Sequence, residues 1–185
     1  MGYGMIADVG NLLVGILSRE LVPDLIPHKN QIGLCSPDGH GDLKVGIFLY
    51  NISENPDIRI SGMVNAGATR QVYPSTYLDL YYMITAYSDT DMKYRAEEEH
   101  RILGRIIQAL GDNRILSEAI LGGNVSMPAK IQFQKMESYE KNRMWNFQEL
   151  SYKLSLFYVV RPVEIPSARS KDIVRVRDVE YHVQE

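Results

Sequence analysis

The sequence predicts an α+β fold in which a mixed, mainly antiparallel β-sheet packs with two main α-helices. The helices are predicted because apolar residues recur at three- and four-residue steps in residues 6–21 and 88–113. The strands are predicted because several other segments alternate or are rich in β-branched and aromatic residues. Along the chain the order is helix, strand, strand, long loop, strand, helix and then further strands. A chain of 185 residues is large enough to bury the core of one such domain.

The first helix lies close to the N-terminus, where an apolar stretch has to be distinguished from a targeting signal. Its apolar positions recur at helical spacing: Ile6, Val9, Leu13, Ile16, Leu17 and Leu21. Asp8 and Asn11 interrupt the stretch and no basic residue precedes it, which is not the composition of a signal peptide. No run approaches the roughly 20 apolar residues of a bilayer-spanning helix. We therefore expect an amphipathic helix that docks on the core and ends near Pro23.

Two strands are expected next, separated by a glycine-rich turn. The segment NQIGLCS (30–36) is a short apolar run, and LKVGIFLYNI (43–52) is apolar on both faces, as in a strand that is covered on both sides. In the turn between them, Asp38, His40 and Asp42 alternate and are candidate ligands for a divalent metal. No second group of ligands accompanies them, so a solvated turn is the favoured interpretation.

Residues 58–73 have no sustained period and contain Gly, Asn, Ala and Thr. They are expected to form a long loop or an irregular hairpin arm, which includes Arg59 and Arg70. Loops of this length in a compact domain are usually functional or mobile.

The segment YPSTYLDLYYMITAY (73–87) holds five of the twelve tyrosines of the chain. Read as a strand, one of its sides is a core face: Leu78, Leu80, Tyr82, Ile84 and Ala86. The other side carries Tyr77, Tyr81 and Tyr87 with an acid and a hydroxyl. Either a layer of the same chain covers this side or it is a protein contact surface, where tyrosine is enriched because its ring is apolar and its hydroxyl can still bond.

The clearest helix follows in residues 88–113, where a serine or aspartate of the segment SDTD can cap its start. Its expected buried stripe is Ala96, His100, Leu103, Ile106, Ile107 and Leu110. His100 lies beside three glutamates, but Arg101 already supplies a cation on that face. A structural histidine is therefore favoured over a metal ligand.

The final third of the sequence is rich in strand signals. AKIQFQKMES (129–138) alternates like a half-buried strand, and LSYKLSLFYVVRPVEIP (150–166) is a longer apolar strand. Between them, YEKNRMWNFQ (139–148) carries the only tryptophan and predicts a short helix or turn. KDIVRVRDVEYHV (171–183) mixes charge into both faces and is predicted to be an edge strand, an arm onto a neighbour or a frayed tail.

Composition and motifs argue against several classes of function. The formal net charge of −3 gives no overall attraction to nucleic acid or to an anionic membrane. The single cysteine, Cys35, excludes an internal disulfide and is interpreted as a small buried hydrophobe. The sequence contains no glycine-rich phosphate loop, no G-x-S-x-G motif and no paired Cys or His at zinc spacing. We therefore expect no catalytic residues, no metal, no cofactor, and no nucleic-acid or membrane partner.

Three blocks of the sequence resemble the tube-terminator, or cap, proteins of extracellular contractile injection systems of the antifeeding-prophage and virulence-cassette type. The blocks are MIADVGNLLVGILSREL; VGIFLYNISENPDIR, continued after a variable loop by YLDLYYMITAYSDTD and AEEEHRILGRIIQAL; and MWNFQELSYKLSLFYVVRPVEI. The single positions that carry the resemblance are Asn55, Pro56, Arg59, Trp145, Ser155, Tyr158, Pro162 and Val163. The blocks cover most of residues 5–166, and their order and spacing make the resemblance specific.

The resemblance implies a non-catalytic domain over residues 1–166, similar in fold to phage tail terminators, followed by a C-terminal strand or arm over 167–185. Cap proteins of this family form a hexameric ring on the distal end of the inner tube, stop its growth and engage the last sheath ring. The implied partners are other copies of the chain, the tube protein and the sheath protein. The implied location is the cytoplasm of the producing bacterium during assembly and the distal end of the finished particle.

In such a ring each subunit repeats a head-to-tail contact with its neighbour. The candidate residues for ring or tube contacts are Tyr77, Tyr81 and Tyr87 on the strand, Arg59 and Arg70 in the 58–73 loop, and Arg175 and Arg177 in the C-terminal arm. Several family members carry a further C-terminal region, whereas this sequence ends at Glu185. The arm is therefore the candidate replacement for any sheath contact that such a region makes.

Two other interpretations remain open at this point. The nearer one is a tail or neck terminator of a contractile phage, which differs in its partners rather than in its physics. The farther one is a small metal-dependent enzyme that uses His40, Asp42 and His100.

Overall fold

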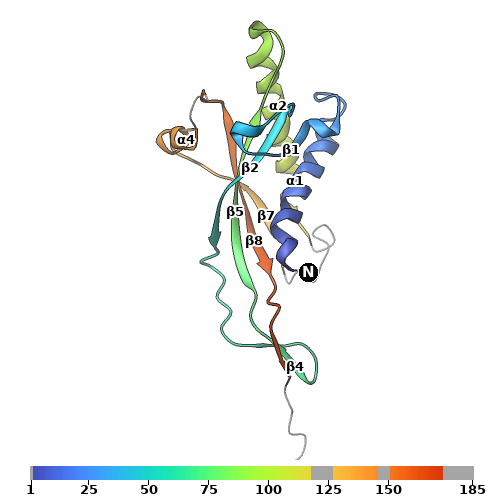
Figure 1. Ribbon diagram of the computed structural model, residues 1–185, viewed down its shortest axis with the longest axis vertical. Helices are drawn as coiled ribbons and strands as arrows, with labels where there is room; N and C mark the ends of the chain where they lie inside the picture. The colour runs from blue at the N-terminus through green and yellow to red at the C-terminus, as the bar shows by residue number, and fades with distance from the viewer. Residues whose placement is uncertain (1, 118–126, 146–150, 173–185) are drawn as a thin grey trace, which may run out of the picture.

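A six-stranded sheet runs through the centre of the molecule, and a small three-stranded sheet extends away from it at one end (Figure 1). The computed structural model describes residues 2–117, 127–145 and 151–172. The larger sheet consists, in spatial order, of β1 (Ile32–Leu34), β2 (Val45–Glu54), β5 (Thr76–Ala86), β8 (Ser155–Ile165), β7 (Ala129–Phe133) and β6 (Ile115–Leu116). The smaller sheet consists of β3 (Val64–Asn65), β4 (Arg70–Val72) and β9 (Ser170–Asp172).

The larger sheet is mixed and mainly antiparallel, which confirms the fold class predicted from the sequence. β1 pairs with β2 in parallel, and the other neighbouring strands pair antiparallel. β5 lies at the centre, where Tyr82 is flanked by Leu49 of β2 and Tyr158 of β8. The tyrosine-rich segment is therefore a central strand, and two β-sheet partners fix its register.

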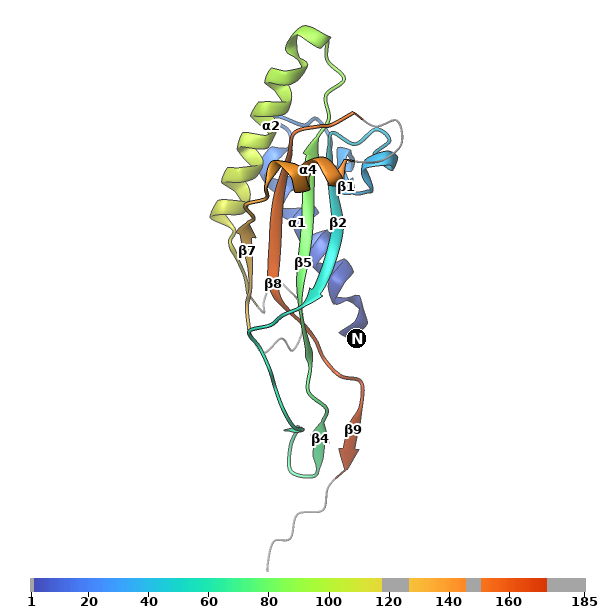
Figure 2. The same ribbon diagram turned by 90° about the vertical axis from the view of Figure 1, so that its left-hand side faces the viewer.

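Two long helices cover one face of the larger sheet, and a short helix lies on the other face (Figure 2). The helices are α1 (Met5–Leu21), α2 (Met92–Asp112) and α4 (Ser138–Met144). Single 3₁₀ turns occupy Gly2–Gly4, Lys29–Gln31 and Pro37–Gly39. Among the described residues, none of the helices has the length and apolar character that a membrane span requires.

The main core lies between the two long helices and the sheet. From β5 it takes Leu80, Tyr82, Ile84 and Ala86, with Leu78 packed at its margin, so the predicted core face of this strand is confirmed. From α1 it takes Val9, Leu13, Ile16, Leu17 and Leu21, as the helical spacing predicts. Burial of this apolar surface is the main source of stability, at roughly 25 cal/mol per Å² removed from water.

A smaller cluster lies on the opposite face of the sheet, beneath α4. Met83, Trp145 and Phe157 are its buried members, and Phe48 and Tyr50 of β2 pack against it. The tryptophan is therefore a cover for the second face of β2 and β5. This face is why the sequence of β2 is apolar on both sides.

The buried stripe of α2 differs from the predicted one by a small rotation of the helix. Leu103, Ile106 and Leu110 are buried as expected, and Ile102 and Ala109 join them. Ala96 and His100 are exposed and Ile107 is 47% exposed, so the prediction that these three residues are buried is wrong. The helix presents a different edge to the sheet because it packs beside α1 as well as on β5.

The segment predicted as a long loop or an irregular hairpin is an ordered hairpin, in which β3 pairs with β4. β4 pairs in turn with β9, which begins the segment predicted as a C-terminal strand or arm. After α2, Ile115 and Leu116 form the two-residue strand β6.

Candidate assembly surfaces

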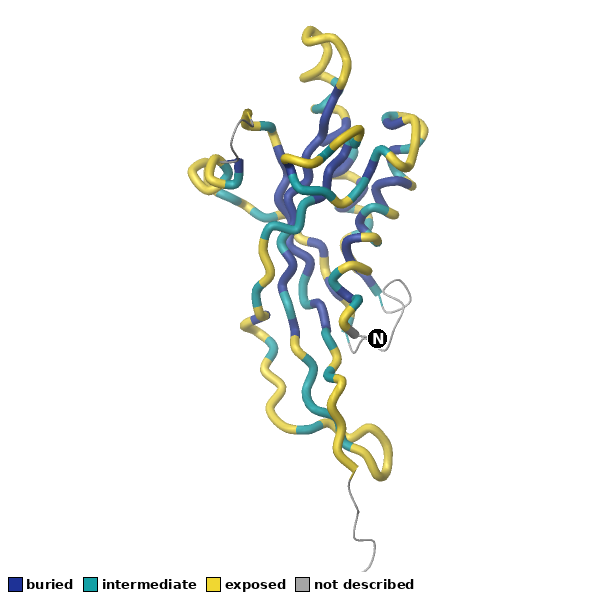
Figure 3. Tube along the Cα trace, viewed as in Figure 1, coloured by how far each residue is buried: buried dark blue, intermediate teal, exposed yellow. Residues whose placement is uncertain are grey.

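We call residues 56–75 and 166–172 the arm, and the remaining described residues the body. The arm extends beyond the end of the larger sheet, and most of its residues are exposed and none is buried (Figure 3). Within residues 59–70 only Met63 is even partly buried. Neither hydrophobic cluster of the described residues includes an arm residue. The arm is therefore a projecting structure that has no core of its own.

Polar contacts and strand pairing hold the arm together. Arg70 Nη2 donates a hydrogen bond to Ser170 Oγ at 2.8 Å, which ties β4 to β9. The guanidinium group of Arg169 lies 4.4 Å from the centre of the Tyr73 ring, as in a cation–π contact. Gly62 and Gly67 have φ values of +99° and +95°, which non-glycine residues rarely adopt, and they allow the chain to turn at these two points.

A buried polar network joins the arm to the body. Asp79 on β5 is 1% exposed. Its Oδ1 accepts a hydrogen bond of 2.6 Å from Asn55 Nδ2, and its Oδ2 accepts one of 3.3 Å from Arg161 Nη1. Asn55 Oδ1 accepts from the backbone N–H groups of Asp57 and Ile58, at 3.0 and 3.1 Å. The network therefore fixes the turn at which the chain leaves β2 and enters the arm.

The two predicted arginines of the 58–73 segment both lie on the arm and both are exposed. Arg59 lines a groove at the base of the arm, together with Ile60, Pro74 and Tyr77. Arg70 is in β4 near the end of the arm. Both side chains lie where a partner could reach them, and their role in contacts stays a prediction. Arg175 and Arg177, the other predicted arginines, lie outside the described residues.

The three predicted tyrosines of the 73–87 segment, Tyr77 and Tyr81 in β5 and Tyr87 just after it, differ in how much surface they offer. Tyr77 is 4% exposed and Tyr87 is 5% exposed, so a single copy of the chain already buries both rings. Tyr81 is half-buried, and its hydroxyl accepts a hydrogen bond of 3.4 Å from Ser53 Oγ. Of the three, Tyr81 is the one with accessible surface. A layer of the same chain, the alternative left open by the sequence, accounts for Tyr77 and Tyr87.

Tyr87 is covered by the glycine-rich turn between β1 and β2. The His40 ring stacks on the Tyr87 ring with centroids 3.9 Å apart and planes 10° from parallel. On the same tyrosine, Lys153 Nζ lies 5.5 Å from the ring centre. Burial raises the pKa of the Tyr87 phenol to about 12, with the neighbouring Cys35 thiol adding to the rise. His40 therefore has a packing role.

The described residues contain no group of three or more His, Cys, Asp or Glu side chains that could hold a metal ion. His40 packs on Tyr87, and His100 lies exposed on α2. The structure therefore gives no support to the metal-dependent alternative based on His40, Asp42 and His100.

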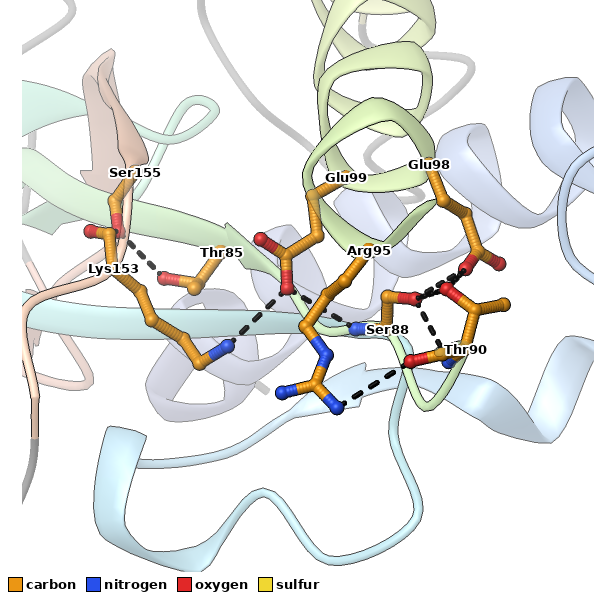
Figure 4. Close-up of polar contacts among 8 residues, drawn as sticks. All are labelled: Thr85, Ser88, Thr90, Arg95, Glu98, Glu99, Lys153 and Ser155. Atoms are coloured by element: carbon orange, nitrogen blue, oxygen red, sulfur yellow. Dashed lines mark hydrogen bonds and ion pairs between the residues drawn. The ribbon is translucent and has the colours of Figure 1, made fainter. Parts of the chain in front are cut away.

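A polar cluster fixes the connection between β5 and α2 (Figure 4). Glu98 accepts hydrogen bonds from the hydroxyls of Ser88 and Thr90. Glu99 accepts from the Ser88 backbone N–H at 3.3 Å and from Lys153 Nζ at 3.2 Å. The cluster joins the chain before α2 to the chain before β8, and so holds the first turns of α2 where they project beyond the sheet.

Two apolar surfaces lie at the opposite edges of the larger sheet. The β7-edge groove lies between α2 and the outer edge of the sheet, and it is lined by Ile107, Arg114, Ile115, Lys130 and Phe133 among others. The β2-edge notch lies beyond the end of β1, and it is lined by Tyr3, Ile6, Ala7, Leu34 and Phe48 among others. Figure 2 shows β7 and β2 on the two sides of the sheet.

The sequence analysis did not identify these edge residues. Ile115 and Phe133 are 59% and 60% exposed, and Tyr3 and Leu34 are 80% and 46% exposed. Ile107 and Phe133 each continue an apolar period, so a reading of periodicity assigns them to the core. These residues are exposed because β1 and β6 are too short to cover the strands beside them, and that shortness appears only in the structure.

Two solved structures share this fold. The PVC sheath/tube terminator of an extracellular contractile injection system, in its extended state, matches with a TM-score of 0.70 at 20% identity, over 97% of this chain and 63% of that chain. The anti-feeding prophage cap (AFP tube terminating cap) matches with a TM-score of 0.70 at 23% identity, over 96% of this chain and 61% of that chain. This chain therefore spans about three fifths of the length of both.

The comparison of sequences gives one family. No curated protein matches the sequence. Residues 8–177 match the Pvc16 N-terminal domain, so the match runs from the start of α1 to beyond β9 and includes the arm. Because the match spans nearly the whole sequence, the chain belongs to the Pvc16 N-terminal domain family.

Proposed function

We propose that this chain is a structural cap that terminates the inner tube of a contractile injection system. Six copies form a ring on the distal end of the tube, prevent further addition of tube protein and engage the last ring of the sheath. The observation that carries the proposal is the likeness of fold to two tube-terminating proteins over 97% and 96% of this chain, arm included. Membership of the Pvc16 N-terminal domain family supports it.

We assign the contact with the tube to the arm. A projecting hairpin without a core of its own can gain stability by packing on a partner, and the arm exposes the apolar side chains of Ile60 and Val64 for that purpose. The described arm carries more cations than anions: Arg59, Arg70, Arg169 and Lys171 against Asp57 and Asp172. The surface of the tube end is accordingly one with apolar pockets and an excess of carboxylates. Tyr81 and the segment with Arg175 and Arg177 are further contact candidates.

Terminating a tube in this way requires no catalytic residues. The sequence carries none of the nucleophile, phosphate-loop or zinc motifs named above, and a growing tube stops when its last ring no longer presents a surface for the next. Assembly takes place in the cytoplasm of the producing bacterium, and the cap remains at the distal end of the particle.

The test is a tube assembly reaction with and without the chain. Purified tube protein is allowed to polymerise at increasing ratios of this chain to tube protein, and tube lengths and ends are measured by electron microscopy. We expect the mean length to fall as the ratio rises, and a ring of extra density to appear at one end of each tube.

The control is the triple variant Arg59→Glu, Ile60→Asp and Arg70→Glu, in which the arm should no longer bind. These side chains are exposed, so the variant should fold normally and leave tube length unchanged. Tubes of equal length with bare ends at every ratio of the unmodified chain would show that it is not a terminator.

A further inference from the structure

The two edges of the larger sheet are incompletely covered by the strands that flank them. β1 pairs with only the first three residues of β2, from Val45 to Ile47, and the six-strand order places no other strand beside the rest of β2 on that side. At the other edge, β6 pairs with only Ala129 and Lys130 of β7. Within the described residues, the outer backbone of Leu49–Glu54 thus remains open at one edge, and so does that of Gln132 and Phe133 at the other. Open, apolar strand edges are surfaces on which another chain can pair or pack.

The two edge surfaces share an apolar centre and differ in charge. Arg114 and Lys130 are the charged residues that line the β7-edge groove. No charged residue lines the β2-edge notch, and the exposed Asp8 follows Ile6 and Ala7 of its lining along α1. The basic rim of the groove therefore faces, in a neighbouring copy, an apolar surface with a carboxylate beside it.

The direction of the strands also matches. β2 and β8 run one way and β5 and β7 run the other, because every pair between them is antiparallel. A rotation about an axis parallel to the strands leaves these directions unchanged. The β7 edge of one copy would therefore face the β2 edge of the next copy as an antiparallel neighbour, which is the pairing used through most of this sheet.

We propose that the β7-edge groove of one copy packs against the β2-edge notch of the next copy, and that this single head-to-tail contact, repeated around an axis, closes the ring. The proposal rests on the ring-forming function proposed above and assigns it a pair of surfaces. The two surfaces lie at opposite edges of the sheet, so the groove and the notch of one copy cannot contact each other. A contact between two different surfaces continues from copy to copy, whereas a contact of one surface with itself ends at a dimer.

The experiment uses two variants, each of which disables one surface. Phe133→Glu places a carboxylate at the apolar centre of the groove, where packing against the apolar notch would strip it of water. Leu34→Lys places a cation in the notch, where it faces the basic rim of the groove. Both positions are exposed, at 60% and 46%, so both variants should fold. Tyr139→Glu, at an exposed position on α4 away from both edges, is the matched control.

Association is measured by sedimentation velocity, with tube protein present if the chain alone stays monomeric. We expect Tyr139→Glu to form rings like the unmodified chain, and each edge variant to lose rings through at least about a tenfold weaker self-association, as for a central interface residue. A circular dichroism spectrum and melting curve equal to those of the unmodified chain establish that the loss is not one of folding.

Mixing the two edge variants is the decisive step. Each retains the surface that the other lacks, so an equimolar mixture should associate through that intact pair of surfaces, at concentrations where neither variant associates alone. Rings from either variant alone would overturn the proposal, and so would a mixture that stays monomeric. An unmodified chain that forms no ring with or without tube protein would instead contradict the proposed function itself. If the groove instead binds a segment of the tube or sheath protein, the edge variants will form rings but fail to bind that protein. This result would also overturn the proposal.

Discussion

The body and the arm of this molecule differ in what holds them together. In the body, α1, α2 and α4 bury both faces of the larger sheet, and side chains such as Leu80 and Ile106 are fully buried. In the arm, three strands of two or three residues pair with one another and bury no residue completely (Figure 3). The body has the means to fold by itself, whereas the arm has strand pairing and a few polar contacts. The body therefore carries the stability of the fold, and the arm is the surface that we propose for binding.

The largest expected effect is on the stability of the body. Leu80→Ala removes a fully buried side chain and should lower the free energy of unfolding by about 2–5 kcal/mol, through lost burial and the cavity left behind. Ile60→Ala, in the arm, removes a side chain that is 42% exposed and should cost less than about 0.5 kcal/mol. Urea unfolding measures both. Equal losses of stability in the two variants would contradict the difference between body and arm, because they would place the arm inside the cooperative core.

The junction between the two regions should give the next largest effect. Asp79→Ala leaves the buried amide of Asn55 and the guanidinium of Arg161 without their shared acceptor, which should cost about 1–3 kcal/mol. Asp57→Ala removes an exposed carboxylate 3.8 Å from the same arginine and should cost less than about 1 kcal/mol. A double-mutant cycle between Asp79 and Asn55 should show coupling, since the two side chains are in direct contact. Additive losses would show that the hydrogen bond between Asp79 and Asn55 does not stabilise this junction.

Alkaline pH should weaken the body through its buried tyrosines. Burial raises the pKa of Tyr50, Tyr87 and Tyr158 to about 12, from an ordinary value of 10.0. The unfolded chain therefore loses these protons before the folded chain does. Their contribution to stability is complete below pH 10 and declines as the pH rises towards 12. Urea unfolding across this range measures the decline, and Tyr87→Phe should reduce it. An unchanged decline in that variant would count against burial of the Tyr87 hydroxyl.

The smallest effect on stability should come from the cations of the arm. Arg70→Ala removes one exposed hydrogen bond to Ser170 and should change the free energy of unfolding by less than about 0.5 kcal/mol. The same change should weaken binding to tube ends severalfold, and the loss should shrink at high salt because exposed charges are screened. Arg101→Ala is the matched control, since its side chain pairs with Glu97 on α2 and lies on the body. Equal loss of tube binding in both variants would remove the arm from the contact.

The regular elements of the body were predictable because their residues meet local rules. The helical spacing of α1 marks its buried face, and the period-two reading of β5 marks its side toward the long helices; both predictions hold. The resemblance of three sequence blocks pointed to the family that the Pvc16 N-terminal domain match identifies. Ile107 shows the limit of such rules, because the exact face that α2 buries depends on its contact with α1.

The candidate surfaces were less predictable, because they depend on contacts between distant segments. The arm is made from residues about 100 positions apart, such as Arg70 and Ser170, and a period in the sequence contains no information about that pairing. Tyr77 and Tyr87 were predicted to be contact candidates, but within one copy they are only 4% and 5% exposed, and the His40 ring stacks on Tyr87. The open strand edges follow from the shortness of β1 and β6, which only the sheet order reveals.

Hydrogen exchange of the backbone amides, measured on the free chain and on the chain bound to tube ends, is the most direct test of tube binding by the arm. In the free chain we expect slow exchange in β2, β5 and β8 and fast exchange in residues 59–72. On tube ends the arm should become protected, while the central strands change little. Arm amides that exchange equally fast in both states, on a chain shown to be bound, would contradict the assignment of tube binding to the arm.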